Sequence, residues 1–163
     1  MRETTVTDLR LEDRASISDR VIAYATALDR RDWGLLRSLM TPQVHIDYTD
    51  FDPSLDLSMP ADEWVQRVTE GLSGFDSTQH ISANHVFTFD GDSAVCVSQM
   101  QAAHFLIEAD NMASSVIHGY YTTALTQVDG QWLIQAVTLS ITATLGDTGV
   151  YERAAKRFQE SSQ

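Results

Sequence analysis

Four long segments of alternating hydrophobicity follow one another in the second half of the chain and constrain its fold most. They cover residues 78–89, 93–107, 113–128 and 131–145, and their period of two is typical of β-strands with one face turned inward. Asp90-Gly91-Asp92 separates the first two, and Asp129-Gly130 separates the last two. Glycine accepts the positive φ of a tight hairpin turn. The sequence therefore predicts a run of antiparallel strands joined by turns.

Helical patterns dominate the first half. Residues 13–31 carry apolar side chains at intervals of three and four, which predicts a long helix with one apolar face. These apolar side chains are Ile17, Val21, Tyr24, Ala25 and Leu28. Asp32 can cap a second, short helix that carries Trp33, Leu36, Leu39 and Met40. Thr41-Pro42 ends this helix, because a residue before proline avoids the α region.

The middle of the chain combines a strand, a loop and a third helix. Residues 44–48 predict a short strand, and residues 49–58, rich in Asp, Ser and Pro, predict an irregular loop. Pro60 suits the first position of a helix whose buried side includes Trp64 and Val68, and which would lid or wall a cavity. A final helical pattern covers residues 148–159. Helices followed by an antiparallel meander indicate one α+β domain over residues 1–163, with a curved, cone-shaped sheet wrapped around the N-terminal helices.

Charge excludes several classes of partner. Eleven Lys and Arg against twenty-three Asp and Glu give a net charge of -12, which repels nucleic acid and anionic lipid. Residues 1–11 lack a signal-peptide pattern, and no apolar run has the length of a membrane span, so we expect a cytoplasmic protein that binds neither nucleic acid nor membrane. Cys96 is the single cysteine and is expected to be a buried core residue.

Three residues are candidates for acid/base chemistry. Asp29 ends the apolar face of the first helix, where a carboxylate facing the core needs a partner, although a solvated helix-end acid is an equal alternative. His80 and His104 lie on successive predicted strands, which antiparallel pairing could bring together. A lone histidine at such a position is more often structural, so the residues alone leave both interpretations open.

Several segments together resemble scytalone dehydratase, a member of the SnoaL-like, nuclear transport factor 2-like superfamily. The resemblance covers about residues 22–142 and keeps the family's order. It rests on Asp29-Arg30-Arg31-Asp32-Trp33, Thr41-Pro42, Ile46-Asp47-Tyr48, Met59-Pro60-Ala61-Asp62-Glu63-Trp64, Thr78-Gln79-His80, His104 and Val128-Asp129-Gly130-Gln131-Trp132. It implies the α+β roll of that superfamily, also described as cystatin-like.

The resemblance also implies roles for four residues. Asp29 looks like the aspartate that orients the first catalytic histidine, and His80 looks like that histidine. His104 resembles the second histidine, which would assist the leaving hydroxyl. Tyr48 looks like one of two tyrosines that hold a water against the substrate carbonyl.

Other positions depart from the family pattern. Leu28 stands where the second water-holding tyrosine is expected, and Gly119 and Tyr121 align with the family's serine and asparagine. Tyr24, five residues before Asp29, is a partial replacement, as related enzymes place a tyrosine or lysine there. The expected substrate-binding residues are Tyr24, Leu28, Phe51, Trp64, Gly119 and Tyr121. A rewritten cavity makes scytalone itself a doubtful substrate.

The resemblance predicts a lyase of the dehydratase type that needs no cofactor and no metal. Its small, cyclic, largely apolar substrate would lose a proton next to a carbonyl- or phenol-activated carbon, with His80 as base and Asp29 as its partner. An isomerase or cyclase using the same base, or a non-catalytic module that binds a small ligand, are the alternatives. A homotrimer is expected from the resemblance alone.

Overall fold

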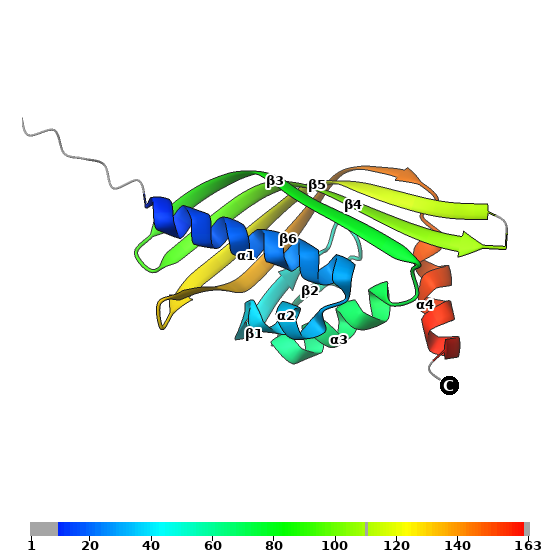
Figure 1. The fold of residues 1–163 in the computed structure, drawn as a ribbon, viewed down its shortest axis with the longest axis horizontal. Helices are drawn as coiled ribbons and strands as arrows, with labels where there is room; N and C mark the ends of the chain where they lie inside the picture. Colours follow the sequence, from blue (N-terminus) through cyan, green and yellow to red (C-terminus); the bar gives the residue numbers. More distant parts are fainter. Residues whose placement is uncertain (1–9, 110, 162–163) are drawn as a thin grey trace, which may run out of the picture.

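A computed structural model describes residues 10–109 and 111–161. Figure 1 shows a long helix lying across a curved sheet, with two shorter helices below its middle and the C-terminal helix at the right-hand end. The predictions for residues 1–9, 110 and 162–163, including most of the segment considered for a signal peptide, fall outside the described residues. In chain order the elements are α1 (Leu11–Arg30), α2 (Trp33–Ser38), β1 (Met40–Asp47), β2 (Asp56–Pro60), α3 (Ala61–Leu72), β3 (Ser77–Asp90), β4 (Ser93–Glu108), β5 (Asn111–Val128), β6 (Gln131–Gly146) and α4 (Val150–Ser161).

The described strands form one sheet of six in the order β2-β1-β6-β5-β4-β3. The four long strands make the antiparallel meander that the sequence predicts. β1 joins β6 in parallel and β2 antiparallel, so the sheet as a whole is mixed. The α+β prediction of a curved sheet around N-terminal helices is confirmed.

The segment between β1 and α3 differs from the predicted loop over residues 49–58. Residues 56–60 form β2, whose Asp56 pairs with Asp47 and whose Pro60 pairs with Gln43. Because β2 is an edge strand, it tolerates a proline that cannot donate a ladder hydrogen bond. The prediction of an irregular loop was therefore wrong at this end.

Two helix boundaries also shift by a few residues. Met40 was expected in the second helix but begins β1, where it pairs with Ile134 of β6. The register shift that follows Met40 accommodates Pro42 inside the strand, since a bulge frees a residue from the ladder. Pro60 lies at the N-cap of α3 rather than at its first helical position.

Helix α1 fills the concave side of the sheet. Its buried face packs against β3 and β6, and includes Ile17, Val21, Tyr24 and Leu28. The helix ends at Arg31, whose left-handed φ of 53° turns the chain toward α2. The Arg31 guanidinium donates to the carbonyls of Leu72 at 3.1 Å and Phe75 at 3.0 Å, which fixes the C-terminal end of α1 against the segment between α3 and β3.

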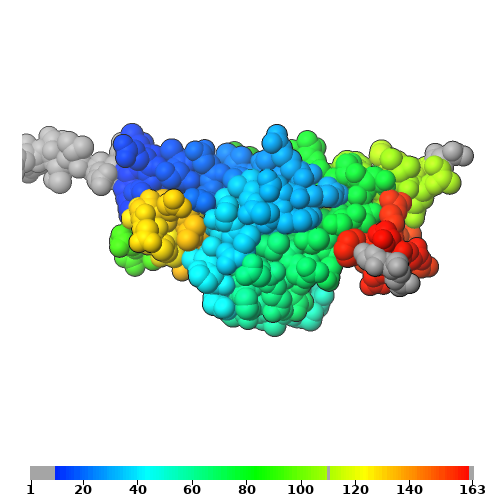
Figure 2. Space-filling view, turned by 60° about the horizontal axis from the view of Figure 1, so that its bottom comes forward, coloured from blue at the N-terminus to red at the C-terminus, as the bar shows by residue number. Residues whose placement is uncertain are grey.

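Helix α4 docks against β4 and β5, beside α3 (Figures 1 and 2). Val150 and Ala154 bury against Phe75 and Leu106 in a small second core. Gly74 lets the two segments approach closely, because a methyl group on residue 74 would overlap the backbone carbonyl of Ala154. Arg157 adds hydrogen bonds to Asp76 at 2.8 Å and to the carbonyl of Ile107 at 2.7 Å.

Candidate active site

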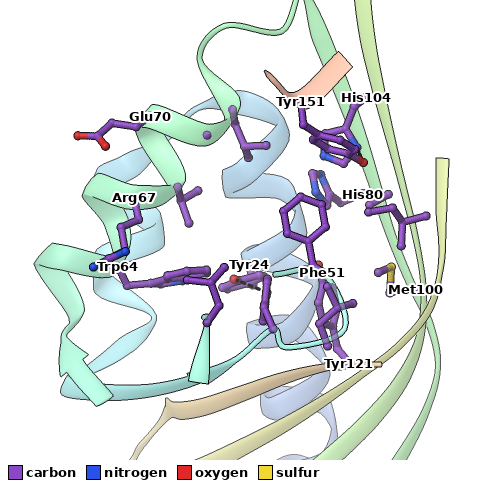
Figure 3. A pocket seen from close by; sticks show the side chains of 18 of the residues that line it. Tyr24, Phe51, Trp64, Arg67, Glu70, His80, Met100, His104, Tyr121 and Tyr151 are labelled. Carbon is purple, nitrogen blue, oxygen red and sulfur yellow. Dashed lines mark hydrogen bonds between the residues drawn. The ribbon is translucent and has the colours of Figure 1, made fainter. Parts of the chain in front are cut away.

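A cavity of about 390 Å³ opens between the sheet, α3 and α4 (Figure 3). Aromatic and aliphatic side chains make most of its wall. Its lining consists of Tyr24, Tyr48, Phe51, Leu55, Trp64, Arg67, Val68, Glu70, Gly71, Leu72, His80, Met100, Ala102, His104, Ile117, Tyr121, Leu139, Tyr151 and Ala155. Such a volume is typical of a site for one small organic molecule.

The structure brings Asp29 and His80 together at the inner wall. Asp29 Oδ1 lies 2.7 Å from His80 Nδ1, and Asp29 Oδ2 accepts from the His80 backbone N–H at 2.8 Å. The Thr78 hydroxyl donates to Oδ1 at 3.0 Å. Burial disfavours the charged carboxylate, but the hydrogen bonds from His80 and Thr78 outweigh this effect and lower the pKa of Asp29. The carboxylate is therefore ionised at neutral pH and held by three donors.

This contact determines which nitrogen of His80 faces the cavity unprotonated. An ionised carboxylate only accepts hydrogen bonds, so the neutral ring carries its proton on Nδ1, against Asp29. The Nε2 lone pair is left for the cavity, whose wall His80 helps to form. The His80 side chain is only 6% exposed, which keeps bulk water away from this nitrogen.

His104 lies next to His80 because of the strand register. Thr78 of β3 pairs with His104 of β4, and His80 pairs with Ala102, so both rings point to the same side of the sheet. The ring centroids are 5.4 Å apart and the planes are nearly perpendicular. Burial, reinforced by the neighbouring His80, lowers the pKa of His104 from 6.5 to about 3. His104 is therefore neutral at neutral pH.

Three tyrosines form another part of the wall. The hydroxyls of Tyr24 and Tyr48 are 3.2 Å apart, and the rings of Tyr48 and Tyr121 stack at 6.2 Å. Burial raises the pKa of Tyr24, Tyr48 and Tyr121 above the ordinary value, so all three stay protonated. The wall thus presents neutral hydroxyl groups that can donate hydrogen bonds to an oxygen in the cavity.

The predicted substrate-binding residues divide into two groups. Tyr24, Phe51, Trp64 and Tyr121 line the cavity, as Tyr48 does. Leu28 and Gly119 do not form part of the wall.

These two residues serve the fold. Leu28 belongs to the core under α1, where it is 4% exposed. Gly119 lies at a register shift between β5 and β6, where a methyl group would overlap the carbonyl of Ser140. Neither position offers a side chain to a molecule in the cavity.

The wall also contains residues that the sequence did not single out. Thr78 was noticed only as part of the segment that ends in His80, yet it binds Asp29. Tyr151 of α4 lies against His104 (Figure 3), and no sequence pattern marks it. Met100 and Ala102 could have been found, because they alternate along β4 with the same parity as His104.

Charged residues of α3 stand at the rim of the cavity and are paired. Arg67 contacts Glu63 at 2.9 Å, and Glu70 accepts from Gln66 at 2.6 Å. In Figure 3, Glu70 points away from the centre of the cavity. The wall beyond this rim consists mainly of apolar and aromatic side chains.

Two negative observations apply to residues 10–109 and 111–161. They contain no group of three or more His, Cys, Asp or Glu side chains placed to hold a metal ion. No helix within them combines the length and apolar character needed to cross a bilayer.

Comparisons with known proteins place this chain in a family. The model of the SnoaL-like domain matches residues 9–138. A scytalone dehydratase-like protein of Claviceps purpurea (strain 20.1) is 30% identical over 129 residues, which are 74% of this chain and 82% of that protein. The family match includes the segment from Asp29 to His104, which carries the acid/base candidates.

Two solved structures share the fold at low sequence identity. The Kfla4162 protein of Kribbella flavida superposes with a TM-score of 0.80 at 21% identity, covering 89% of this chain and 97% of that one. Hexachlorocyclohexane dehydrochlorinase LinA-type3 from Novosphingobium barchaimii LL02 gives 0.69 at 19% identity, covering 87% and 94%. At these identities the likeness concerns the fold. Together with the family match and the curved sheet around α1, it shows that the chain belongs to the SnoaL-like domain family, as a scytalone dehydratase-like member with the nuclear transport factor 2-like fold.

Proposed function

We propose that this protein is a cofactor-independent lyase of the dehydratase type. The observation that carries the proposal is the Asp29–His80 pair, at 2.7 Å, with the second imidazole nitrogen facing an apolar cavity. A histidine held by a carboxylate is suited to act as a general base, because the carboxylate stabilises the imidazolium that forms. The similarity to the scytalone dehydratase-like protein of Claviceps purpurea supports the same class of reaction.

The first step is removal of a proton from a carbon next to a carbonyl or phenol-activated centre. His80 Nε2 takes this proton, and Asp29 balances the new positive charge through Nδ1. The electron pair moves toward the carbonyl oxygen, where the Tyr48 hydroxyl, in contact with Tyr24, donates directly or through water. Hydrogen-bond donors at a developing enolate oxygen are most effective where bulk water is excluded.

The second step is departure of the hydroxyl group on the neighbouring carbon. The enolate electrons form the carbon–carbon double bond, the carbon–oxygen bond breaks, and the His80 imidazolium returns its proton to the departing oxygen to give water. His104 assists as a hydrogen-bond donor rather than as a charged acid, because burial keeps its ring neutral. Protons balance without any outside donor.

The cavity favours a compact neutral substrate. Its volume of about 390 Å³ and its aromatic wall suit one or two fused rings, and its polar groups are neutral hydroxyls and imidazoles. The molecule we expect is a cyclic β-hydroxy ketone, with or without a fused phenol. The homotrimer and the cytoplasmic location stay predictions.

The test is a panel of phenol-fused and simple cyclic β-hydroxy ketones incubated with the protein in D2O. NMR measures deuterium uptake at the activated carbon, and absorbance measures the conjugated product. We expect the conjugated product from the wild type and its loss, by about 10³-fold, in His80→Asn. Deuterium enters the carbon only where the proton on His80 exchanges with solvent before the hydroxyl leaves. The matched control is His85→Asn, on the same strand but away from the cavity wall, which should keep product formation.

The same assay separates the alternatives. Deuterium uptake without loss of water would replace the dehydratase proposal with an isomerase or cyclase that uses the same base. If the protein binds a ligand with neither deuterium uptake nor loss of water, and His80→Asn binds it equally well, a non-catalytic binding module would replace the dehydratase proposal.

A further inference from the structure

Tyr151 connects the C-terminal helix, α4, to His104. Its hydroxyl lies 3.1 Å from His104 Nδ1, and its ring contacts the His104 ring at 5.0 Å. On its other sides the ring meets Phe75 at 5.7 Å and Phe51 at 5.1 Å. Tyr151 therefore touches the cavity mouth, the docking site of α4 and His104 at once (Figure 3).

The direction of the hydrogen bond decides what His104 offers to the cavity. A neutral imidazole has one N–H and one lone pair, whereas a tyrosine hydroxyl can donate or accept. If the hydroxyl donates to Nδ1, the ring proton must be on Nε2. Burial raises the pKa of Tyr151 despite an opposing effect of the Ser115 side chain, so the hydroxyl stays protonated and is able to donate to His104.

A charged His104 would be unfavourable during the reaction. Its ring centroid is 5.4 Å from that of His80, which becomes an imidazolium when it takes the proton. Two adjacent cations in a buried site repel each other. A neutral ring with its N–H fixed in place avoids this cost and still provides a donor.

We propose that Tyr151 is a positioning residue: its hydroxyl donates to Nδ1 of His104, which fixes the ring proton on Nε2 and makes neutral His104 a hydrogen-bond donor for the departing oxygen of the substrate. The role toward the substrate rests on the proposed dehydratase function. The tautomer proposed for His104 rests on the 3.1 Å contact with Tyr151 and does not depend on that function.

The position of Tyr151 also links the donor to the mouth of the cavity. Phe51 lies in the loop between β1 and β2 and is 43% exposed, and its ring packs against Tyr151. Val150, the residue before Tyr151, is fully buried against Phe75 and Leu106. The packing of α4 therefore places both Tyr151 and Ala155 in the cavity wall.

The decisive variant is Tyr151→Phe, which keeps the ring contacts and removes only the hydroxyl. Nitrogen-15 NMR of the histidine side chains reports which ring nitrogen of His104 carries the proton. We expect the wild type to show protonated Nε2 and acceptor Nδ1, and Tyr151→Phe to show a mixture of tautomers. With a substrate found in the panel above, we expect kcat to fall about 10-fold with KM within about twofold.

The control is Tyr120→Phe, which removes a hydroxyl from an exposed tyrosine on β5, the strand that pairs with the one carrying His104. It should change neither the His104 resonances nor kcat. Circular dichroism and the melting temperature confirm that both variants are folded.

Each outcome decides one half of the proposal. Unchanged His104 resonances in Tyr151→Phe would overturn the control of the tautomer, and altered resonances with unchanged kcat would overturn the role in the reaction. If the wild type turns over no member of the panel, the dehydratase proposal fails, while the NMR experiment still decides whether Tyr151 fixes the His104 tautomer.

Discussion

Strand β3 carries two histidines in contrasting environments. His80 has a carboxylate on Nδ1 and the cavity beside its other nitrogen. His85 has a hydroxyl on each nitrogen, from Ser18 at 2.8 Å and from Ser82 at 3.0 Å, and burial lowers its pKa. A histidine whose two nitrogens are both bound to the protein has no lone pair left for a substrate.

The backbone explains why both rings reach the concave side. Residues five apart in a regular strand point to opposite faces. The register shift between Ala83 and Val86, where Asn84 has a φ of 54°, lets His85 face α1 and Ser18. The same residue type on the same face thus has both ring nitrogens bound at one end of the strand and, in the proposed mechanism, supplies the base at the other, and the hydrogen-bond partners make the difference.

The largest effect on the rate should come from removing the carboxylate partner of His80 while keeping the hydroxyl partners of His85. Asp29→Asn replaces an acceptor that favours the imidazolium with a neutral amide, so we expect the rate of dehydration to fall about 10³-fold. Ser82→Ala, which removes a partner of His85, should keep the rate within about twofold. Steady-state kinetics of both variants make the measurement, and equal losses in the two would remove the functional distinction between the histidines.

Buried neutral histidines should also make the protein sensitive to acid. The pKa of His104 is about 3 in the folded state against an ordinary value of 6.5, so below that ordinary value protons bind preferentially to the unfolded chain. The free energy of unfolding should fall by about 3 kcal/mol between about pH 7 and pH 4.5 through this group.

Urea unfolding across this pH range tests the expectation. His104→Asn should flatten the dependence strongly and His85→Asn only slightly. A slope that persists in His104→Asn would show that other groups cause it, while carboxylates such as Asp29, whose pKa is lowered, add their own loss only below about pH 4.

The smallest effect concerns single hydroxyls. Thr78→Val removes one of the donors to Asp29, and the loss of about 1 kcal/mol in a hydrogen bond should lower the rate about fivefold. Ser18→Ala removes a donor or acceptor for His85 and should cost a similar free energy of unfolding without changing the rate. Kinetics and urea unfolding of the two variants should therefore give opposite patterns.

Local patterns were sufficient where one segment alone carries the signal. The period of two over the four long strands predicted the meander, and the apolar face of residues 13–31 predicted α1. Asp29 and His80 were paired from a resemblance that spans both segments, and the structure brings them into contact. Residues 56–60 gave no strand signal, because pairing with β1 rather than their own composition makes them a strand.

Contacts between distant segments were beyond local patterns. Tyr151 and His104 are 47 residues apart in sequence and meet only because α4 folds back over the end of the sheet. Leu28 was placed in the site by its position next to Asp29, but successive residues of a helix point in different directions, so it faces the core. His85 carries no local mark that distinguishes it from His80, since only the bulge and Ser18 give it its role.

Gly74 has a consequence for how the site can change. It contacts no molecule in the cavity, yet the missing side chain is what lets Ala154 and α4 come close enough for Tyr151 and Ala155 to form part of the wall. A larger residue at position 74 would push α4 outward and displace this side of the cavity wall, without contacting Asp29 or His80. Residue 74 can thus change the size of the molecules that the cavity admits without changing the Asp29–His80 pair.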